Sequence, residues 1–139
     1  MAGGKRINEL EIGQKEFVEK TISETDIYLY AGITGDLNPA HVNEEYAKKT
    51  FFKGRIAHGM LTAGLISAVV GMKLPGPGTI YMAQELKFTA PVRIGDTIKA
   101  EGEVVEINKD KNIAVIKTTC TNQDGIVVLT GTATVKPPK

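Results

Sequence analysis

The sequence has very little of the residue types that carry disulfide, metal and nucleic-acid chemistry. Of its 139 residues, one is cysteine, two are histidine and none is tryptophan. The single cysteine, Cys120, excludes an internal disulfide, and two histidines with one cysteine give no recognisable zinc spacing. The formal charge of +1, from 17 basic and 16 acidic side chains, gives no broad field for nucleic acid or a membrane surface. We therefore expect no metal, no nucleic-acid partner and no membrane partner.

Long apolar runs are also missing. The longest apolar-rich stretch, residues 60–72, is too short to span a bilayer and is interrupted by glycines. Residues 1–14 lack the apolar core of a signal peptide and are expected to be loosely held. A lone cysteine fits a reducing compartment. These features predict a cytoplasmic protein, and the length predicts a single domain over residues 1–139.

Several catalytic signatures are absent as well. The chain has no G-x-S-x-G nucleophile elbow, no glycine-rich phosphate loop and no dinucleotide fingerprint after a strand. Their absence argues against a serine hydrolase of the elbow type, against nucleotide hydrolysis and against nicotinamide-dependent hydride transfer.

The residue pattern of the first half of the chain predicts mainly short helices. Residues 15–22 suit a first strand, and Ser23 can cap a helix over residues 24–33 that ends at Gly32 and Gly35. Pro39 disfavours helical geometry at the residue before it, so residues 35–42 are expected to be a tight loop. A second cap residue, Asn43, then predicts a short helix over residues 43–49.

Residues 58–72, HGMLTAGLISAVVGM, are the central feature. They carry no charge after His58 and are apolar on nearly every side, which predicts a helix about 22 Å long that is buried all round. Glycine in a helix costs up to about 1 kcal/mol, so its repeated use suggests that close approach matters here. The small residues form a stripe spaced by four, namely Gly59, Ala63, Ser67 and Gly71.

After the turn at residues 75–78 the apolar period changes from helical to two. This alternation predicts four strands, over residues 80–91, 97–107, 113–120 and 126–136. Polar turns between them, including Asp124-Gly125, predict that the strands follow one another as hairpins in an antiparallel sheet. The uncharged helix is the natural partner of the apolar face of this sheet. The predicted fold class is α+β, with the sheet wrapped around a long central helix.

The motif GDLNPAH places Asp36, Asn38 and His41 on a proline-stiffened segment. A carboxylate and an imidazole five residues apart can hold a water molecule and pass protons in both directions. The spacing alone is unspecific, because Asp36 and Asn38 also suit a turn and His41 also suits packing at a helix start. Residue types by themselves favour the turn interpretation.

Four further residues lie in or near the predicted central helix and sheet. Gly59 has a backbone amide at a helix N-terminus, which can stabilise a thioester oxygen that becomes enolate-like; a packing glycine is the alternative. The preceding residue, His58, is expected to be structural. Ser67 either bonds back to the carbonyl four residues earlier or touches the site. Cys120 is expected to be a strand residue rather than a nucleophile.

Taken together, these segments resemble the (R)-specific enoyl-CoA hydratase, or MaoC-like, family. The resemblance is carried by GDLNPAHVNEEYAKKTFFKGRIAHGMLTAGLISAVVG and by the later GTIYMAQELKFTAPVRIGD, and it covers roughly residues 20–136. The pattern D-x-N-P-x-H, linked to HGM seventeen residues after its histidine, is more specific than either piece alone.

The resemblance implies a hot-dog fold, a homodimer or larger homo-oligomer, and catalysis without a metal or a redox cofactor. The implied reaction is the reversible syn addition of water to trans-2-enoyl-CoA, giving (R)-3-hydroxyacyl-CoA. Asp36 and His41 would be the hydratase dyad, and Asn38 would support their geometry. The Gly59 amide would bind the thioester oxygen, and Ser67 would line or order the site.

The sequence is also compatible with other functions on the same fold. They are a dehydratase for acyl-carrier-protein substrates, an acyl-CoA thioesterase and a non-catalytic acyl-thioester binding protein. The sequence does not indicate the acyl chain length, or which dyad member protonates carbon. Nor does it choose among polyhydroxyalkanoate precursor supply, fatty-acid degradation and a fermentative C4 route.

Overall fold

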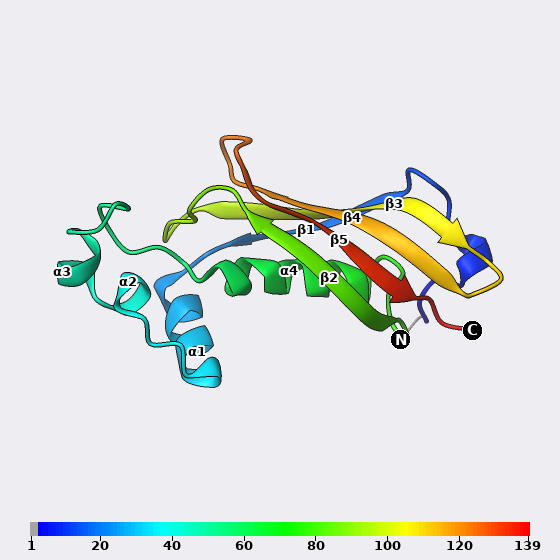
Figure 1. The fold of residues 1–139 in the computed structure, drawn as a ribbon, viewed down its shortest axis with the longest axis horizontal. Coiled ribbons are helices and arrows are strands. Elements are labelled where there is room, and N and C mark those ends of the chain that lie inside the picture. The colour runs from blue at the N-terminus through cyan, green and yellow to red at the C-terminus, as the bar shows by residue number, and fades with distance from the viewer. Residues whose placement is uncertain (1–2) are drawn as a thin grey trace.

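The computed structural model describes residues 3–139. Its elements are η1 (Ile7–Glu9), β1 (Lys15–Thr21), α1 (Glu24–Thr34), α2 (Pro39–Val42), α3 (Glu44–Ala47), α4 (Gly59–Met72), β2 (Ile80–Phe88), β3 (Thr97–Asn108), β4 (Ile113–Thr121) and β5 (Val127–Lys136). Figure 1 shows α4 running along one face of the sheet, with α1, α2 and α3 gathered beyond one end of it. The predicted α+β class is confirmed. No helix in the described part of the chain is long and apolar enough to cross a membrane.

The five strands form one antiparallel sheet in the order β1-β3-β4-β5-β2. The hairpins β3–β4 and β4–β5 are as predicted, but the prediction that β2 and β3 also form a hairpin is wrong. Instead β2 pairs with β5 at one edge, and β1 pairs with β3 at the other. Residues 89–96 carry the chain across the intervening strands, a distance of about 14 Å that eight residues easily span.

The core lies between α4 and the sheet. The inward face of α4 places Thr62, Ile66, Val69 and Val70 at 2% exposure or less. This face packs against fully buried side chains of three strands, including Ile98, Ile116 and Leu129. Burying one such aliphatic side chain contributes about 1.5–3 kcal/mol, so the contact between helix and sheet accounts for much of the stability of the fold.

The prediction that α4 is buried all round is wrong. Met60 and Met72 on this helix are 54% and 61% exposed, and Ser67 and Gly71 are exposed too. A single five-stranded sheet covers only one side of a helix, so the opposite side of α4 is left without a partner among residues 3–139. The neighbouring edge strand β2 also exposes apolar side chains, namely Ile80, Met82 and Phe88. We call these two exposed surfaces the α4–β2 face.

The helix caps explain where α1 begins and ends. The Ser23 hydroxyl accepts a hydrogen bond from the Asp26 amide, and the Asp26 carboxylate accepts one from the Ser23 amide. This reciprocal pair is a capping box. Gly35, in the left-handed conformation at φ 79°, ends the helix, whereas Gly32 lies inside it rather than at its end.

The N-terminal segment is better anchored than its composition predicts. The Gly4 and Lys5 amides donate to the carbonyls of Pro77 and Pro75, at 2.9 and 2.8 Å, and Leu10 is buried in the core. The expectation that residues 1–14 are loosely held is therefore wrong for this part of the segment. Residues 1 and 2 lie outside the described residues.

Candidate active site

The segment expected to be a loop contains a one-turn helix, α2, that carries His41. Asn38 caps it, because its side-chain oxygen accepts a hydrogen bond from the Ala40 amide at 3.0 Å. Pro39 occupies the first helical position, where its fixed φ suits a helix and its missing N–H is not needed. Proline restricts the residue before it, not the residues after it, so the predicted loop over residues 35–42 is wrong for its second half.

The ring of His41 is held by the main chain. Its Nδ1 lies 2.7 Å from the carbonyl oxygen of Ile56. A carbonyl oxygen can only accept, so Nδ1 carries the proton and Nε2 is left as the atom that can accept one. The bond therefore fixes both the tautomer and the direction of the partly buried His41 ring.

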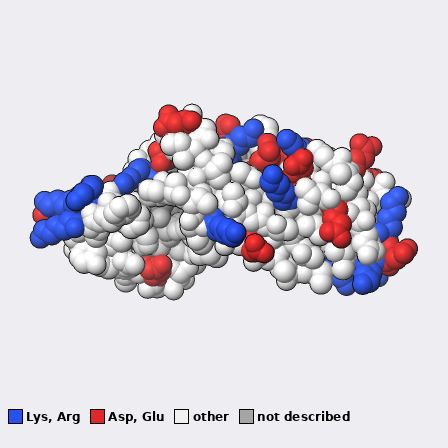
Figure 2. All heavy atoms as spheres, turned by 45° about the horizontal axis from the view of Figure 1, so that its top comes forward, with Lys and Arg blue, Asp and Glu red and all other residues white. Residues whose placement is uncertain are grey.

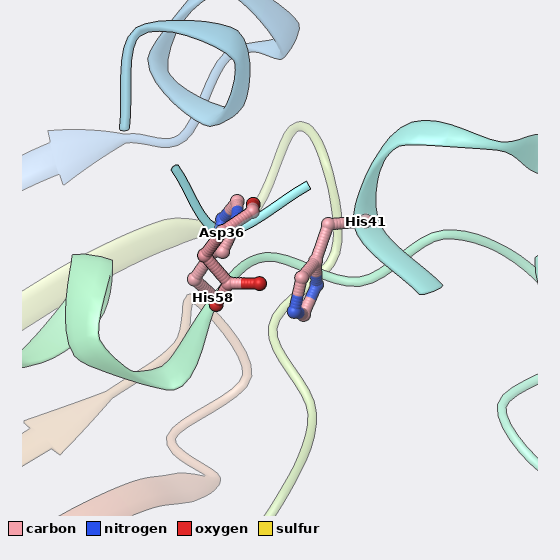
Figure 3. A group of neighbouring side chains, drawn as sticks. All are labelled: Asp36, His41 and His58. Carbon is pink, nitrogen blue, oxygen red and sulfur yellow. The ribbon is translucent and has the colours of Figure 1, made fainter. Parts of the chain in front are cut away.

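Asp36 lies in the turn between α1 and α2, and its carboxylate points toward the His41 ring (Figure 3). One carboxylate oxygen accepts the Asn38 amide at 3.2 Å, and the Asp36 amide donates to the Thr34 hydroxyl at 3.1 Å. Asp36, His41 and His58 each offer a polar atom within 4.8 Å of the others. The structure therefore brings Asp36 and His41 together, and adds His58 to them.

His58 contacts both of these residues, a feature that the sequence interpretation missed. It is 2% exposed, and its Nε2 lies 3.0 Å from the main-chain oxygen of Asp36. Its ring is stacked on that of His41, with centroids 3.9 Å apart and planes at 32°. The only sequence signal for this role is a histidine placed directly before the first helical residue, Gly59.

An aspartate and two histidines are also the residue types of many metal sites. In this cluster Nε2 of His58 is already hydrogen-bonded to a carbonyl oxygen. Nitrogen ligands of a zinc ion must converge on it at about 2.0–2.1 Å. With its Nε2 already hydrogen-bonded, His58 has only Nδ1 left as a possible ligand for an ion shared with Asp36 and His41.

A cavity of about 500 Å³ opens beside the cluster. A volume of this order is typical of sites for small molecules and cofactors. Asp36, His41 and Gly59 line it, together with mainly apolar side chains that include Phe51, Phe52, Ile56, Phe88 and Val92. Asn38 does not line this cavity. It contributes instead by capping the helix that carries His41.

Gly59 is the first residue of α4, with His58 as its N-cap. The amides of Gly59 and Met60 find no hydrogen-bond acceptor within residues 3–139. A Cβ built on Gly59 would lie 2.7 Å from the Cδ1 and Cε1 atoms of Phe88, closer than real Cβ contacts. Gly59 is therefore a packing glycine and also presents a free amide at the cavity, so the two interpretations of this residue are compatible.

Ser67 lies on the exposed side of α4 and does not line the cavity. It is eight positions from Gly59, about 12 Å along the helix. Its hydroxyl makes no hydrogen bond to any described residue, so the alternative in which it bonds back to the carbonyl four residues earlier is not observed. Within one chain, Ser67 is not brought to the other predicted site residues.

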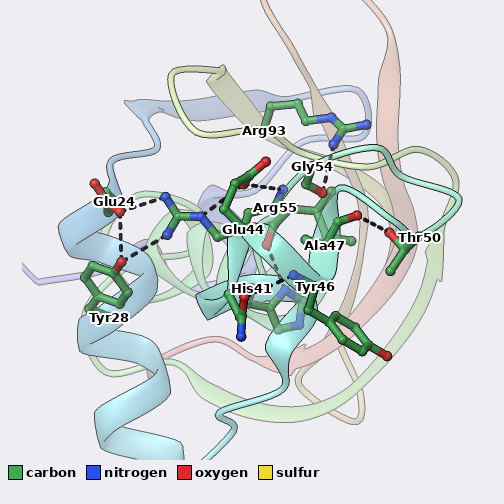
Figure 4. Close-up of polar contacts among 12 residues, drawn as sticks. Glu24, Tyr28, His41, Glu44, Tyr46, Ala47, Thr50, Gly54, Arg55 and Arg93 are labelled. Carbon is green, nitrogen blue, oxygen red and sulfur yellow. Dashed lines mark hydrogen bonds and ion pairs between the residues drawn. The ribbon is translucent and has the colours of Figure 1, made fainter.

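A polar network holds the segment before α4 against α1 (Figure 4). Arg55 pairs with Glu24 at 2.7 Å and with Glu44 at 3.4 Å, and it donates to the Tyr28 hydroxyl at 3.0 Å. The hydrogen bond from Arg55, with one from Tyr28, lowers the pKa of Glu24, and the pair raises the pKa of Arg55. This network fixes the segment whose Ile56 carbonyl orients His41.

The fold and the cluster together define a MaoC-like protein, and comparison with known proteins supports this directly. Residues 8–124 match the MaoC-like domain, and the chain belongs to that family. It is 57% identical over 130 residues to an (R)-specific enoyl-CoA hydratase of Rhodospirillum rubrum, over 94% of this chain and 90% of the relative.

Two solved structures are similar to it over nearly the full length. R-hydratase PhaJ1 from Pseudomonas aeruginosa, in its unliganded form, is 46% identical with a TM-score of 0.92, over 98% of this chain and 87% of that one. The (R)-hydratase from Aeromonas caviae involved in PHA biosynthesis is 41% identical with a TM-score of 0.90, over 93% and 98%. The hot-dog arrangement implied by the sequence resemblance is confirmed.

Proposed function

We propose that this protein is an (R)-specific enoyl-CoA hydratase, a hydro-lyase that adds water reversibly to trans-2-enoyl-CoA and yields (R)-3-hydroxyacyl-CoA. The observation that carries the proposal is the pairing of the Asp36 carboxylate with the free Nε2 of His41 at an apolar cavity. The relatives named as (R)-hydratases, at 57% and 46% identity, support the same reaction.

In the proposed mechanism a water molecule lies between Asp36 and His41. The thioester oxygen accepts a hydrogen bond from the Gly59 amide, which stabilises the enolate-like charge that develops there. The water oxygen forms a bond to the β-carbon as one of its O–H bonds breaks, and the π electrons of the double bond move toward the thioester. The dyad takes the proton from water and supplies one to the α-carbon, so we treat its two members as one coupled unit. Delivery from one side gives syn addition.

The substrate has an apolar end and a polyphosphate end. The cavity walls suit the acyl chain, because a hydrocarbon chain gains free energy by leaving water. Lys and Arg side chains gather at the end of the molecule occupied by α3 (Figure 2). That segment carries the exposed Lys48, Lys49 and Lys53, close in sequence to the cavity residues Phe51 and Phe52. We assign the CoA phosphates to this end.

We infer that the active form is a homodimer joined through the α4–β2 face. β2 is an edge strand, so its outer main-chain groups are open to pairing with another strand. A two-fold related copy would continue the sheet across β2 and would cover the apolar side of α4. Ser67 would then lie at the interface. Its distance from Gly59 would therefore not prevent it from acting at a site that includes the interface. The solution mass tests the inference, and a monomeric mass for the active protein would contradict it.

The test of the reaction is the loss of the enoyl-thioester absorbance when the protein is mixed with crotonyl-CoA. A thiol reagent in a parallel sample detects release of CoA. Asp36→Asn and His41→Ala should each reduce turnover by at least about 100-fold, the usual scale for loss of acid–base catalysis. Asp110→Asn, in the exposed turn between β3 and β4, is the matched control and should keep full activity.

The other possible results of these assays would contradict the dyad or indicate a different function. Near-normal turnover in folded Asp36→Asn or His41→Ala would contradict the dyad. Thiol release would indicate a thioesterase. No reaction with crotonyl-CoA or with longer enoyl-CoAs, but reaction with carrier-bound substrate, would indicate an acyl-carrier-protein dehydratase.

A further inference from the structure

We infer that His58 is the positioning residue of the dyad: it holds Asp36 through a main-chain carbonyl and His41 through a ring contact. The inference rests on the proposed hydratase function and adds to it a residue that does not itself touch the reacting atoms. Its two contacts are independent of each other, one being a hydrogen bond and the other a stack.

The first contact anchors the turn that bears Asp36. The side-chain and amide hydrogen bonds of Asp36 reach only Thr34 and Asn38, two positions away on either side. Among the described residues, the bond from His58 Nε2 to the Asp36 carbonyl is the only one that ties Asp36 to a distant part of the chain. Without it, every hydrogen bond of Asp36 would be to a residue within two positions of it.

The second contact fixes the plane of the catalytic imidazole. The Ile56 carbonyl holds one edge of the His41 ring, and the ring of His58 lies against its face. An edge contact alone leaves the ring able to rock about the hydrogen bond. With the face contact added, Nε2 of His41 keeps a single direction relative to the Asp36 carboxylate.

His58 itself is well placed to act as a fixed reference. It occupies the N-cap position of the 14-residue helix α4 and is almost fully buried. Tyr30 of α1 packs on its ring with centroids 4.7 Å apart. Its Nδ1 makes no hydrogen bond with any described residue, so the bond to Asp36 is the one polar contact of the side chain. Each contact can therefore be removed separately by substitution.

Three variants separate the two contacts. His58→Phe keeps a ring but loses the N–H donor, His58→Gln keeps a donor near the position of Nε2 but loses the ring, and His58→Ala loses both. Displacing a catalytic group by about 1 Å can cost about 100-fold in rate. We expect kcat to fall about 10-fold in the Phe and Gln variants and about 100-fold in the Ala variant, with KM within about threefold of wild type.

A matched control and a double variant distinguish positioning from general damage to the fold. Ile66→Val, on the buried face of the same helix and outside the cavity lining, should lower stability by about 0.5–1.5 kcal/mol without changing kcat. Residues that act as a unit are not additive, so His58→Phe should have little further effect in a His41→Ala background.

Amide hydrogen exchange gives a second readout that needs no substrate. The amides of Asp36, Asn38 and His41 should exchange at least about tenfold faster in His58→Phe than in wild type, whereas those in the middle of α4 should not change. Wild-type kcat in His58→Ala, equal effects of His58→Phe with and without His41, or unchanged exchange in the Asp36–His41 segment would each overturn the inference. Inactive wild-type protein would count against the hydratase function alone, because the exchange experiment still decides the role of His58.

Discussion

The glycine at the start of α4 offers the sharpest test of how space and hydrogen bonding combine at the site. In Gly59→Ala the new Cβ meets two ring carbons of Phe88 at 2.7 Å, where ordinary contacts lie at 3.4–4 Å. The ring must therefore move by roughly 0.7 Å or more. Overpacking of this kind costs about 1–3 kcal/mol, against which alanine gains up to about 1 kcal/mol in helix propensity. We expect a net loss of about 1 kcal/mol in the free energy of unfolding.

The fall in kcat of Gly59→Ala should be larger than its small loss of folding stability explains, because Gly59 and Phe88 both line the cavity. The decisive comparison is the double variant Gly59→Ala/Phe88→Leu. Phe88 is half-exposed, and replacing it with the smaller leucine removes the clash while the main-chain amide at position 59 stays in place. If the amide is the group that binds the thioester oxygen, the double variant should recover most of the lost kcat. Denaturant unfolding and the crotonyl-CoA assay measure the two effects. A single variant that is more stable than wild type by about 1 kcal/mol would refute the steric reasoning.

Two further predictions concern the helix that carries His41 and the buried thiol. Asn38→Ala removes the cap of α2, so it should lower the free energy of unfolding by about 0.5–2 kcal/mol and should also lower kcat. Asn38→Ser keeps a capping side chain and should retain most of the activity. Equal kcat in both variants would contradict this prediction. Burial raises the pKa of Cys120 to about 12, so the thiol stays neutral in the native protein while the unfolded chain ionises above about pH 8.5. The native state is therefore progressively disfavoured as the pH rises above about 8.5, and the stability advantage of wild type over Cys120→Ala should shrink by up to about 1.4 kcal/mol per pH unit between pH 9 and 10 in denaturant titrations. A constant difference would show that the thiol ionises equally in both states.

The sequence predicted those features of the fold that depend on residues adjacent in the chain, such as helix caps and turns. Ser23 and Gly35 mark the ends of α1, and Asp124-Gly125 marks the turn between β4 and β5. The pairing of β2 with β5 was not predictable in this way. It joins segments separated by two other strands, and an alternating pattern says which face is apolar but not which strand is the neighbour.

The exposure of one side of α4 was missed for a different reason. The sequence of an apolar helix does not show whether its second face is covered by its own chain or by another molecule. Composition therefore predicted burial on all sides, whereas the single chain leaves Met60 and Met72 exposed. His58 illustrates a third limit. Its ring contacts Tyr30 and His41, which come from two other helices, and no spacing rule within one segment joins such residues.

Ile56 combines two tasks in one residue, and they belong to different atoms. Its main-chain oxygen sets the tautomer of His41, while its side chain forms part of the cavity wall. A substitution at position 56 changes the side chain but leaves a carbonyl in the same place. Substitutions at this position can therefore change the shape of the acyl site without changing which nitrogen of the catalytic imidazole carries the proton. Substrate range and catalytic chemistry can in this way evolve separately in this protein.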